Sequence, residues 1–452
     1  MTAHAPHPHR DATYERWRWQ VFGITWLAYA GFYLTRKSIA AATIPLTDDV
    51  GIRLSESDIS RIDMAYLIAY ALGQILWGIS GDKVGTRRVV LLGMFASALT
   101  GCMAALAVHP QIAENSARLA QLLGICMLLQ GIWQSCGWAP LTKNVSNFFA
   151  VHERGVVLGL WASNYAVGAA VAQTFAGYMA KHYGVSATFY GPALVLAGIA
   201  TLFFLLQRNR PEDVGLAPVE EYRGEKLTVL EEGERPEEEP EGSWKVTREV
   251  LTNPMVLLLA FVYFFVKPTR YAIFLWGPKY LNDKLGTGVY ESSFLSSAFD
   301  IAGPVSVLLG GLVSDWLFRS KRVPVIVLSL LSLSVLLFFM DYLPPSKYWL
   351  ATCFFCIGLL LYAPDAMISA TAAVDFGTRK GASTAAGLIN CLGSIGAVLG
   401  GGAPGLLREK LGFDWGGVFN VLALSVLIAG LLMLPRWNAV PATAPDNNNE
   451  QS

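Results

Sequence analysis

The sequence predicts an all-α membrane protein with twelve transmembrane helices in two pseudosymmetric six-helix bundles. Of its 452 residues, 53% are hydrophobic and only 15% are charged, whereas soluble domains have about a quarter of their residues charged. The apolar segments form two sets of six, separated by a charged interval. Short motifs recur in both sets at a nearly constant offset, which indicates a duplicated unit.

A membrane helix needs about 20 mostly apolar residues, and the chain offers twelve such segments. Those of the first half lie near 20–45, 59–81, 88–108, 119–149, 154–180 and 186–207. Those of the second half lie near 253–281, 291–318, 323–343, 347–373, 381–408 and 413–436. The interval between the sets contains EEGERPEEEPEG, which is too charged to span a membrane or to fold alone. The expected organisation is therefore a tail (1–18), a first bundle (19–207), a central loop (208–252), a second bundle (253–436) and a disordered tail (437–452).

Basic residues in the short loops predict the orientation. They are concentrated on the side that the two termini share, and they include Arg16, Arg18, Lys83, Arg87, Arg88, Arg154, Arg319, Lys321, Arg322, Arg379 and Lys380. The opposite loops hold fewer, among them Arg53, Lys181, Lys284 and Lys347. Because cytoplasmic loops carry the excess of Lys and Arg, we expect a multi-pass protein of the inner membrane with both termini and the central loop in the cytoplasm.

Corresponding loops of the two halves carry related motifs. GISGDKVGTRR follows the second span and GLVSDWLFRSKR follows the eighth, so that Asp82 and Asp315 occupy corresponding positions. In the same way, Arg154-Gly155 follows the fourth span and Lys380-Gly381 follows the tenth. Both pairs are separated by nearly the same length of chain, as expected of a duplicated unit. Such a repeat is common among secondary transporters.

Other classes of protein find little support in the sequence. It has neither the G-x-x-x-x-G-K-[ST] loop of ATP-driven pumps nor the H-E-x-x-H motif of metalloproteases. Cys353 and Cys356 have redox-motif spacing but lie in an apolar run without other ligands. The 34 basic and 34 acidic residues balance, so net charge does not point to a nucleic acid. We expect a protein that is not an enzyme and has no cofactor or metal.

Two adjacent cations, Arg36 and Lys37, interrupt the first span. A charge at the centre of a membrane helix costs about 2.5–3.5 kcal/mol, so such a residue reaches the interface, pairs with an acid such as Asp63 or Asp300, or faces a cavity. Arg270 in the seventh span follows Arg36 by nearly the same length of chain that separates the loop motifs. Matching positions in a pseudosymmetric carrier face each other across a central cavity. Two such arginines predict a site for a dianionic phosphate, whose oxygens guanidinium groups bind bidentately.

Helix geometry distributes the remaining polar residues. Lys267 shares a helix face with Arg270 and is a plausible second phosphate contact. Lys37 is about 100° from Arg36 around the helix, so it is better placed to pair with an acid, for which Asp300 is favoured. Asn164 and Asn390 occur in matching spans, the fifth and the eleventh. They either bond a sugar hydroxyl or stabilise helix packing.

The loop GDKVGTRR and the twelve spans resemble the major facilitator superfamily. The resemblance implies a latch between helices at the cytoplasmic side, formed by Gly81, Asp82, Gly85, Arg87 and Arg88, with Asp315 at the corresponding place in the second half. Within that superfamily, FYLTRKS, GWAPLTKN, PEDVGL and the WGP that follows Arg270 resemble the organophosphate:phosphate antiporters, which include bacterial glycerol-3-phosphate and hexose-6-phosphate exchangers. VKPTRYAIFLW and LINCLGSIGAVLGG are similar to the animal sugar-phosphate exchangers.

This second resemblance implies that Arg36 and Arg270 bind the phosphoryl group and that Tyr362 is a binding-site tyrosine. It also implies a monomer. Tyr165 stands where the glycerol-3-phosphate carriers have a histidine, which leaves sugar phosphates and phosphoglycerates open as substrates beside glycerol 3-phosphate.

The predicted function is the exchange of a phosphorylated metabolite for inorganic phosphate by alternating access. Glycine-rich stretches such as GLINCLGSIGAVLGGG are expected to permit close helix contact. Two rivals stay open. One is a proton-coupled symporter of an organic anion, with Asp63, Asp300 or Asp365 carrying the proton, and the other is a sugar-phosphate sensor with a transporter fold.

Overall fold

The computed structural model of the chain describes residues 11–48, 53–113, 115–222, 248–249, 251–319, 321–371 and 382–439. Within these ranges the protein is helical and contains no β-strand, which confirms the predicted fold class. Each of the twelve predicted spans corresponds to one helix or to two helices in tandem.

The helices of the first half are, in chain order, α1 (Ala12–Arg36), α2 (Ser38–Asp48), α3 (Glu56–Val84), α4 (Thr86–Ala107), α5 (Pro110–Ala113), α6 (Ser116–Gln134), α7 (Trp138–Ser146), α8 (Val151–Trp161), α9 (Ser163–Tyr183) and α10 (Ala187–Leu206). Two short segments follow, η1 (Pro211–Val214) and α11 (Val219–Tyr222). The helices of the second half are α13 (Pro254–Leu285), α14 (Val289–Phe318), α15 (Arg322–Phe338), α16 (Lys347–Ala366), α18 (Ala382–Leu411) and α19 (Trp415–Met433). Short turns η2 (Met340–Tyr342), η3 (Met367–Thr371) and η4 (Leu434–Arg436) flank them.

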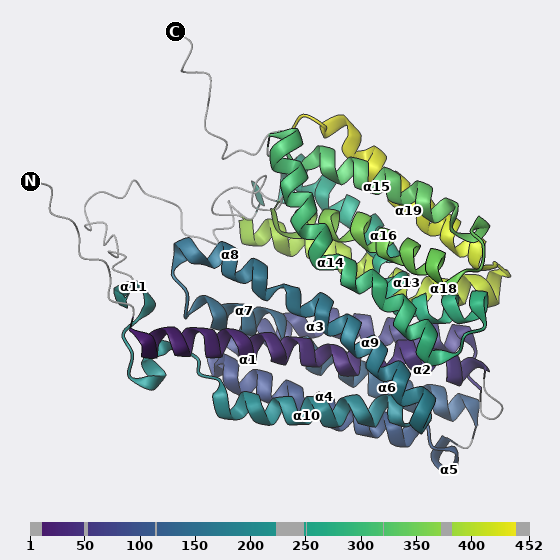
Figure 1. Cartoon of the computed structure of the whole chain (residues 1–452), viewed down its shortest axis with the longest axis horizontal. Helices are drawn as coiled ribbons and strands as arrows, with labels where there is room; N and C mark the ends of the chain where they lie inside the picture. The colour runs from purple at the N-terminus through teal and green to yellow at the C-terminus, as the bar shows by residue number, and fades with distance from the viewer. Residues whose placement is uncertain are drawn as a thin grey trace, which may run out of the picture.

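The two halves form neighbouring bundles, drawn in purple to teal and in green to yellow in Figure 1. They pack along two seams, between α3 and α18 and between α9 and α14. Helix α1 begins and α19 ends on the same side of the molecule (Figure 1). We call this side the near end. The opposite side, where α2 ends and α3 begins, is the far end.

Length and composition make most of these helices suitable for crossing a membrane. Eight helical segments of the described part are long and apolar enough to do so, and α15 is a shorter apolar helix. The other three predicted spans are α1 with α2, α3, and α8 with α9. Helices α1 and α3 carry charged residues along their length, and both contribute to the site described below.

The first helix begins at Ala12, before the predicted boundary of the bundle. Arg18 is buried, and its guanidinium group binds Glu15 at 2.6 Å and also binds Glu153 of α8. These ion pairs hold residues 12–18 against the first bundle. The segment expected to be a tail therefore belongs to the bundle from residue 12 onward.

The start of the central interval is also ordered. The ring of Tyr222 in α11 stacks on that of Tyr14 in α1, with centroids 3.7 Å apart. The side-chain amide of Asn144 donates to the Asn209 carbonyl oxygen at 3.0 Å. The predicted loop thus begins with a segment that packs on the first bundle, while residues 223–247 lie outside the described part.

Three of the predicted spans are interrupted along their length. The first is divided at Lys37, between α1 and α2; the fourth at 135–137, between α6 and α7; and the fifth at Ala162, between α8 and α9. Broken helices in carriers bring backbone and polar side chains to the substrate site. The break at Lys37 is directly beside Arg36, one of the two arginines predicted to bind phosphate.

Glycines allow α18 to approach the helices on both of its sides. A Cβ atom at Gly396 would lie 2.2 Å from the carbonyl oxygen of Phe264 in α13. One at Gly405 would lie 2.3 Å from the carbonyl oxygen of Glu56 in α3. Backbone atoms cannot move away as a side chain can, so neither position has room for a larger residue. The close helix contact predicted for the glycine-rich stretch is confirmed.

Replacement of Gly396 tests this packing. Gly396→Ala is expected to lower stability by about 1–3 kcal/mol, because overpacking forces α18 away from α13. Thermal unfolding of the purified protein in detergent measures the change. Gly387→Ala is the matched control on the same helix, because no atom lies within 4 Å of a Cβ there and alanine favours the helix. Equal stability of the two variants would contradict the packing argument.

Candidate functional site

A cavity between the two halves brings together residues of α1, α3 and α13. It encloses about 340 Å³ of space free of protein atoms, part of which is open to solvent. Its walls are formed by Tyr33, Arg36, Tyr66, Leu67, Tyr70, Arg270, Tyr271 and Phe274. The two arginines that the sequence repeat pairs therefore line one cavity, with one arginine from each half.

Neutral groups hold Arg36 in place. Its Nε donates to Gln134 Oε1 at 3.1 Å, and that oxygen also accepts the Tyr66 hydroxyl at 2.9 Å. The guanidinium carbon lies 4.4 Å from the ring centroid of Tyr33 and 4.8 Å from that of Tyr70. Among the described residues, no carboxylate pairs with Arg36, and its Nη2 is buried without a hydrogen-bond partner. A buried guanidinium with an unused donor is suited to an anion.

Arg270 already has a carboxylate partner. Its Nη1 forms an ion pair with Asp365 of α16, and Lys267 Nζ lies 3.2 Å from the other oxygen of the same carboxylate. A carboxylate therefore neutralises Arg270 in this structure, and Lys267, predicted as a second phosphate contact, shares that carboxylate. The reason is that α16 places its carboxylate against the face of α13 that both cations share.

Lys37 pairs with the acid that the sequence favoured. Its Nζ lies 3.1 Å from Asp300 Oδ2 and donates to the Phe274 carbonyl oxygen at 2.9 Å. The Tyr362 hydroxyl donates to the other oxygen of Asp300 at 2.9 Å. Lys37 belongs to the first half and Asp300 to the second, so this buried ion pair joins the two halves beside the cavity.

Two tyrosines connect these groups to Arg270. The rings of Tyr165 in α9 and Tyr362 in α16 stack with centroids 6.0 Å apart and an interplanar angle of 22°. The guanidinium carbon of Arg270 lies 5.5 Å from the Tyr165 centroid and 4.8 Å from the Tyr362 centroid. Both predicted tyrosines therefore lie next to Arg270, in a cation–π arrangement.

The charges of this cluster do not cancel. Its cations are Arg36, Lys37, Lys267 and Arg270, and its carboxylates are Asp300 and Asp365. Four positive charges against two negative ones leave two positive charges. A dianion would balance that excess, because buried charges are unfavourable unless they are paired with opposite ones.

The two predicted asparagines have different surroundings. Asn164 is completely buried, and neither its oxygen nor its nitrogen has a hydrogen-bond partner among the described residues. Asn390 on α18 is exposed. Buried amides are normally hydrogen-bonded, so Asn164 keeps an unused donor and acceptor within the first bundle.

The loop motif contacts the near end of α10. Gly85 directly precedes α4 and has φ of 91°, a conformation that favours glycine. The Arg87 guanidinium donates to the Phe204 carbonyl oxygen, and its backbone N–H donates to Asn209 Oδ1 at 2.9 Å. Arg88 is exposed.

The remaining predicted latch residues lie before this turn or in the second half. Asp315 of the second motif pairs with Arg322 at 3.1 Å. The side chain of Asp82 and the surroundings of Gly81 lie outside the described part. These contacts of Arg87 and Asp315 each join residues of the same half.

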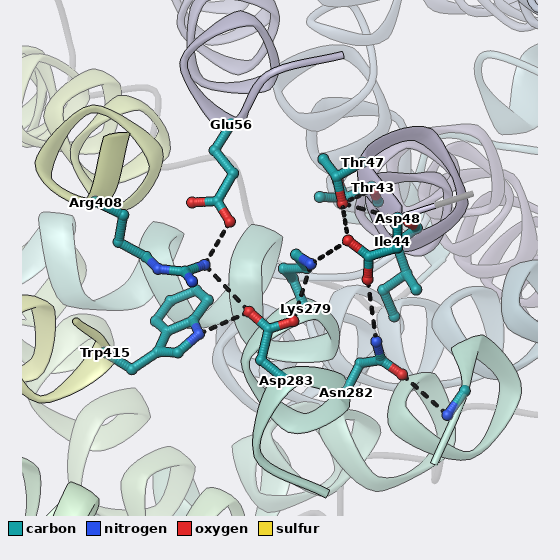
Figure 2. A network of polar contacts seen from close by, with 11 residues as sticks. Thr43, Ile44, Thr47, Asp48, Glu56, Lys279, Asn282, Asp283, Arg408 and Trp415 are labelled. Atoms are coloured by element: carbon teal, nitrogen blue, oxygen red, sulfur yellow. Dashed lines mark hydrogen bonds and ion pairs between the residues drawn. The ribbon is translucent and has the colours of Figure 1, made fainter. Parts of the chain in front are cut away.

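A polar network joins the halves at the far end (Figure 2). Lys279 of α13 binds Asp48 of α2 at 2.5 Å and Asp283 of its own helix at 2.9 Å. Arg408 of α18 binds Glu56 of α3 at 2.5 Å and Asp283 at 3.1 Å. Asp283 therefore links both cations, as Figure 2 shows. We call these five residues the far-end network, and it holds the halves together on that side.

Sequence reasoning missed two contributors to the cavity region. Gln134 orients Arg36, and a signal for it exists in the polar spacing of Gln130 and Gln134, whose amides bond each other at 2.8 Å in an apolar helix. Asp365 was considered only as a proton carrier. Its partners come from α13, 95 residues away for Arg270, and no spacing rule connects them.

Comparison with known proteins agrees with this architecture. A family model described as Major Facilitator Superfamily matches residues 25–401. The chain is 29% identical to the glycerol-3-phosphate transporter of Bacillus subtilis (strain 168), over 96% of this chain and 97% of the relative. It is 27% identical to a probable hexose phosphate transport protein of Chlamydia pneumoniae, covering 94% and 92%, and 28% identical to the membrane sensor protein UhpC of Escherichia coli (strain K12), covering 95% and 94%.

A similar solved structure supports the fold alone. The crystal structure of a bacterial homolog of the human lysosomal transporter Spinster superposes with a TM-score of 0.69 at 15% identity. The match covers 93% of this chain and 95% of that one.

Proposed function

The chain belongs to the Major Facilitator Superfamily, and on that premise we propose that it is a secondary transporter that exchanges a phosphorylated organic metabolite for inorganic phosphate. Candidate metabolites are sugar phosphates, glycerol 3-phosphate and phosphoglycerates. The names of the relatives in Bacillus and Chlamydia support a phosphate ester as substrate.

The observation that carries the proposal is the shared cavity of Arg36 and Arg270. One arginine comes from each half, so an anion between them contacts both bundles at once. The cluster around them has an excess of two positive charges, which a dianionic phosphate group neutralises. Guanidinium groups bind phosphate oxygens with strong, charge-assisted hydrogen bonds.

Transport then follows an alternating-access cycle. The phosphate group takes the unused donor of Arg36 and competes with Asp365 for Arg270, while Tyr33, Tyr66 and Tyr70 contact the organic part of the substrate. Binding to both arginines draws the halves together on one side of the cavity, and their separation on the other side releases the substrate. The empty site retains its excess of charge in a low-dielectric environment, which slows the return of the unloaded carrier. Exchange is therefore obligatory.

The loop charges and the family membership indicate how the transporter lies in the membrane. The protein is a multi-pass membrane protein, and we place both termini and the loop between the bundles in the cytoplasm. The near end is then cytoplasmic and the far end is external. The functional unit is a monomer whose two bundles comprise 19–207 and 253–436, with residues 12–18 added to the first.

Counterflow in proteoliposomes tests the exchange. Vesicles containing the purified protein are loaded with unlabelled phosphate, and labelled phosphate is added outside. Rapid uptake is expected, whereas vesicles without internal phosphate should take up almost none. Glycerol 3-phosphate, glucose 6-phosphate and 3-phosphoglycerate are then added as competitors, with glucose and sulfate as controls. The strongest competitor identifies the substrate class.

Other outcomes separate the rivals. Binding of a phosphate ester to folded protein without any uptake would favour the sensor, a role that the name of the Escherichia coli relative suggests. Uptake that follows a pH gradient and ignores internal phosphate would favour a proton-coupled symporter. Fast phosphate efflux into a medium without counter-substrate would contradict obligatory exchange.

A further inference from the structure

Asp63 of α3 is a buried carboxyl group without a partner among the residues that the structure describes. It is 2% exposed, and its Oδ1 has no hydrogen-bond partner among the described residues. No cation of the described part pairs with it either. A buried, unpaired carboxylate is very unfavourable, so such a group takes up a proton. None of the steps proposed above for phosphate uses Asp63.

The position of Asp63 is the seam between the two halves. A Cβ atom at Gly401 of α18 would lie 3.5 Å from the Asp63 Cβ and 3.4 Å from Leu275 Cδ1 of α13, so α18 packs against Asp63, and α13 lies beside the same glycine. Along α3, Glu56 of the far-end network is seven residues earlier, about 10 Å along the helix. Leu67, which lines the cavity, follows one turn later.

These charged groups of α13 and α18 have partners other than Asp63. On α13, Lys267 and Arg270 bind Asp365, and Lys279 binds Asp48 and Asp283. On α18, Arg408 binds Glu56 and Asp283, and the Glu409 carboxylate accepts a hydrogen bond from Ser57. On α3 itself, Asp58 pairs with Arg61, and the Tyr66 hydroxyl donates to Gln134. With the far end closed, none of these charged groups pairs with Asp63 in the described part of the chain.

We propose that Asp63 is a proton-binding site coupled to the closure of the far end. When α3 and α18 separate there, water reaches the carboxyl group, which releases its proton to the solution at the far end and ionises. When the helices close again, the carboxylate takes a proton from the same solution before it is buried. The proposal rests on the alternating access described above, because it requires a conformation in which the far-end seam is open.

The sign of the pH dependence follows from this linkage. The closed conformation holds one proton more than the open one, so acid favours closure. The ratio of closed to open protein should rise by up to about tenfold for each unit of pH decrease, the limit for one linked proton. The carboxylates of the far-end network act in the opposite direction, because protonation of Asp48, Glu56 or Asp283 breaks ion pairs that hold the end closed. A closed fraction that rises in acid would therefore indicate Asp63, and one that falls in acid would indicate the far-end network.

Distance measurements across the far end test the proposal without any phosphate. Spin labels are placed on Ser116→Cys in the first half and Tyr348→Cys in the second, both exposed positions at that end, after replacement of the six native cysteines. Electron paramagnetic resonance gives the fractions of short and long distances between about pH 5 and pH 8, where an ordinary carboxylate on the surface stays ionised. The fraction of the short distance is expected to rise as the pH falls.

Three variants complete the experiment. Asp63→Asn, which resembles the protonated acid, should favour the short distance and lose the pH dependence. Asp58→Asn, on the same helix but paired with exposed Arg61, should keep it. Glu56→Gln weakens the contact with Arg408, so it should lengthen the distance at every pH and still keep the slope.

A distance distribution independent of pH in both the wild type and Glu56→Gln would overturn the proposal. So would opening in acid, or a pH dependence that survives in Asp63→Asn. Because no phosphate is present, a failure of the exchange hypothesis leaves this readout unaffected.

Discussion

Arg36→Lys and Arg270→Lys are each expected to lower phosphate counterflow at least about 100-fold. Lysine keeps the charge but loses the planar fork that binds two phosphate oxygens. The loss of two charge-assisted hydrogen bonds, at about 1.5–3 kcal/mol each, corresponds to two or more factors of ten. Arg36→Lys also loses the contact of Nε with Gln134. Initial rates of counterflow, at matched amounts of reconstituted protein, give the measurement.

The control for this prediction is a third arginine. Arg61 has a 62% exposed side chain and pairs with Asp58, one turn earlier on α3. Arg61→Lys should leave counterflow within a factor of about two, because exposed ion pairs contribute little. If Arg36→Lys and Arg61→Lys behaved alike, the shared cavity would not be the phosphate site.

Asp365→Asn is expected to tighten phosphate binding and to slow exchange, each by at least about tenfold. The carboxylate neutralises Arg270 and Lys267 in the empty site, so phosphate must displace it. Removal of its charge raises the excess of the cluster from two positive charges to three. An anion then binds more strongly and leaves more slowly, because unpaired buried cations are unfavourable. Equilibrium binding of labelled phosphate and the rate of counterflow measure the two effects.

A second aspartate separates this effect from a general change in charge. Asp315 pairs with Arg322 at the near end and has a 52% exposed side chain. Asp315→Asn should leave the affinity for phosphate unchanged. Weaker phosphate binding in Asp365→Asn would contradict this prediction. It would show that Asp365 positions Arg270 for phosphate and does not compete with phosphate for Arg270.

Much of the fold was accessible from the sequence because a membrane imposes strong patterns. Apolar segments of fixed length predict the twelve spans, and the duplication pairs Arg36 with Arg270 although they lie in different halves of the chain. Helix geometry separated Lys37 from Arg36, and the structure pairs Lys37 with Asp300. These predictions depend on the helical period and on the offset between the two halves, and both can be read from a single sequence.

Contacts that depend on how helices rotate against each other could not be predicted in this way. Asp365 meets Lys267 and Arg270 because α16 and α13 present particular faces to each other. Nothing in the spacing of these residues determines those faces. The start of α1 at Ala12 was missed for a similar reason, since Arg18 finds partners far along the chain, the Phe148 carbonyl oxygen and Glu153 of α8.

The glycines of α18 limit which substitutions can occur during the evolution of this sequence. At Gly400 and Gly396 the neighbouring atoms belong to the backbone of α13, whereas at Gly402 a Cβ would meet the side chain of Met64, 2.3 Å from its sulfur. Backbone cannot be replaced by mutation, but methionine can. Substitutions at 396 and 400 should therefore be absent from related sequences, while a larger residue at 402 is tolerated when a smaller one replaces Met64. The seam between the halves would then evolve as pairs of positions, and the packing within the second bundle would not.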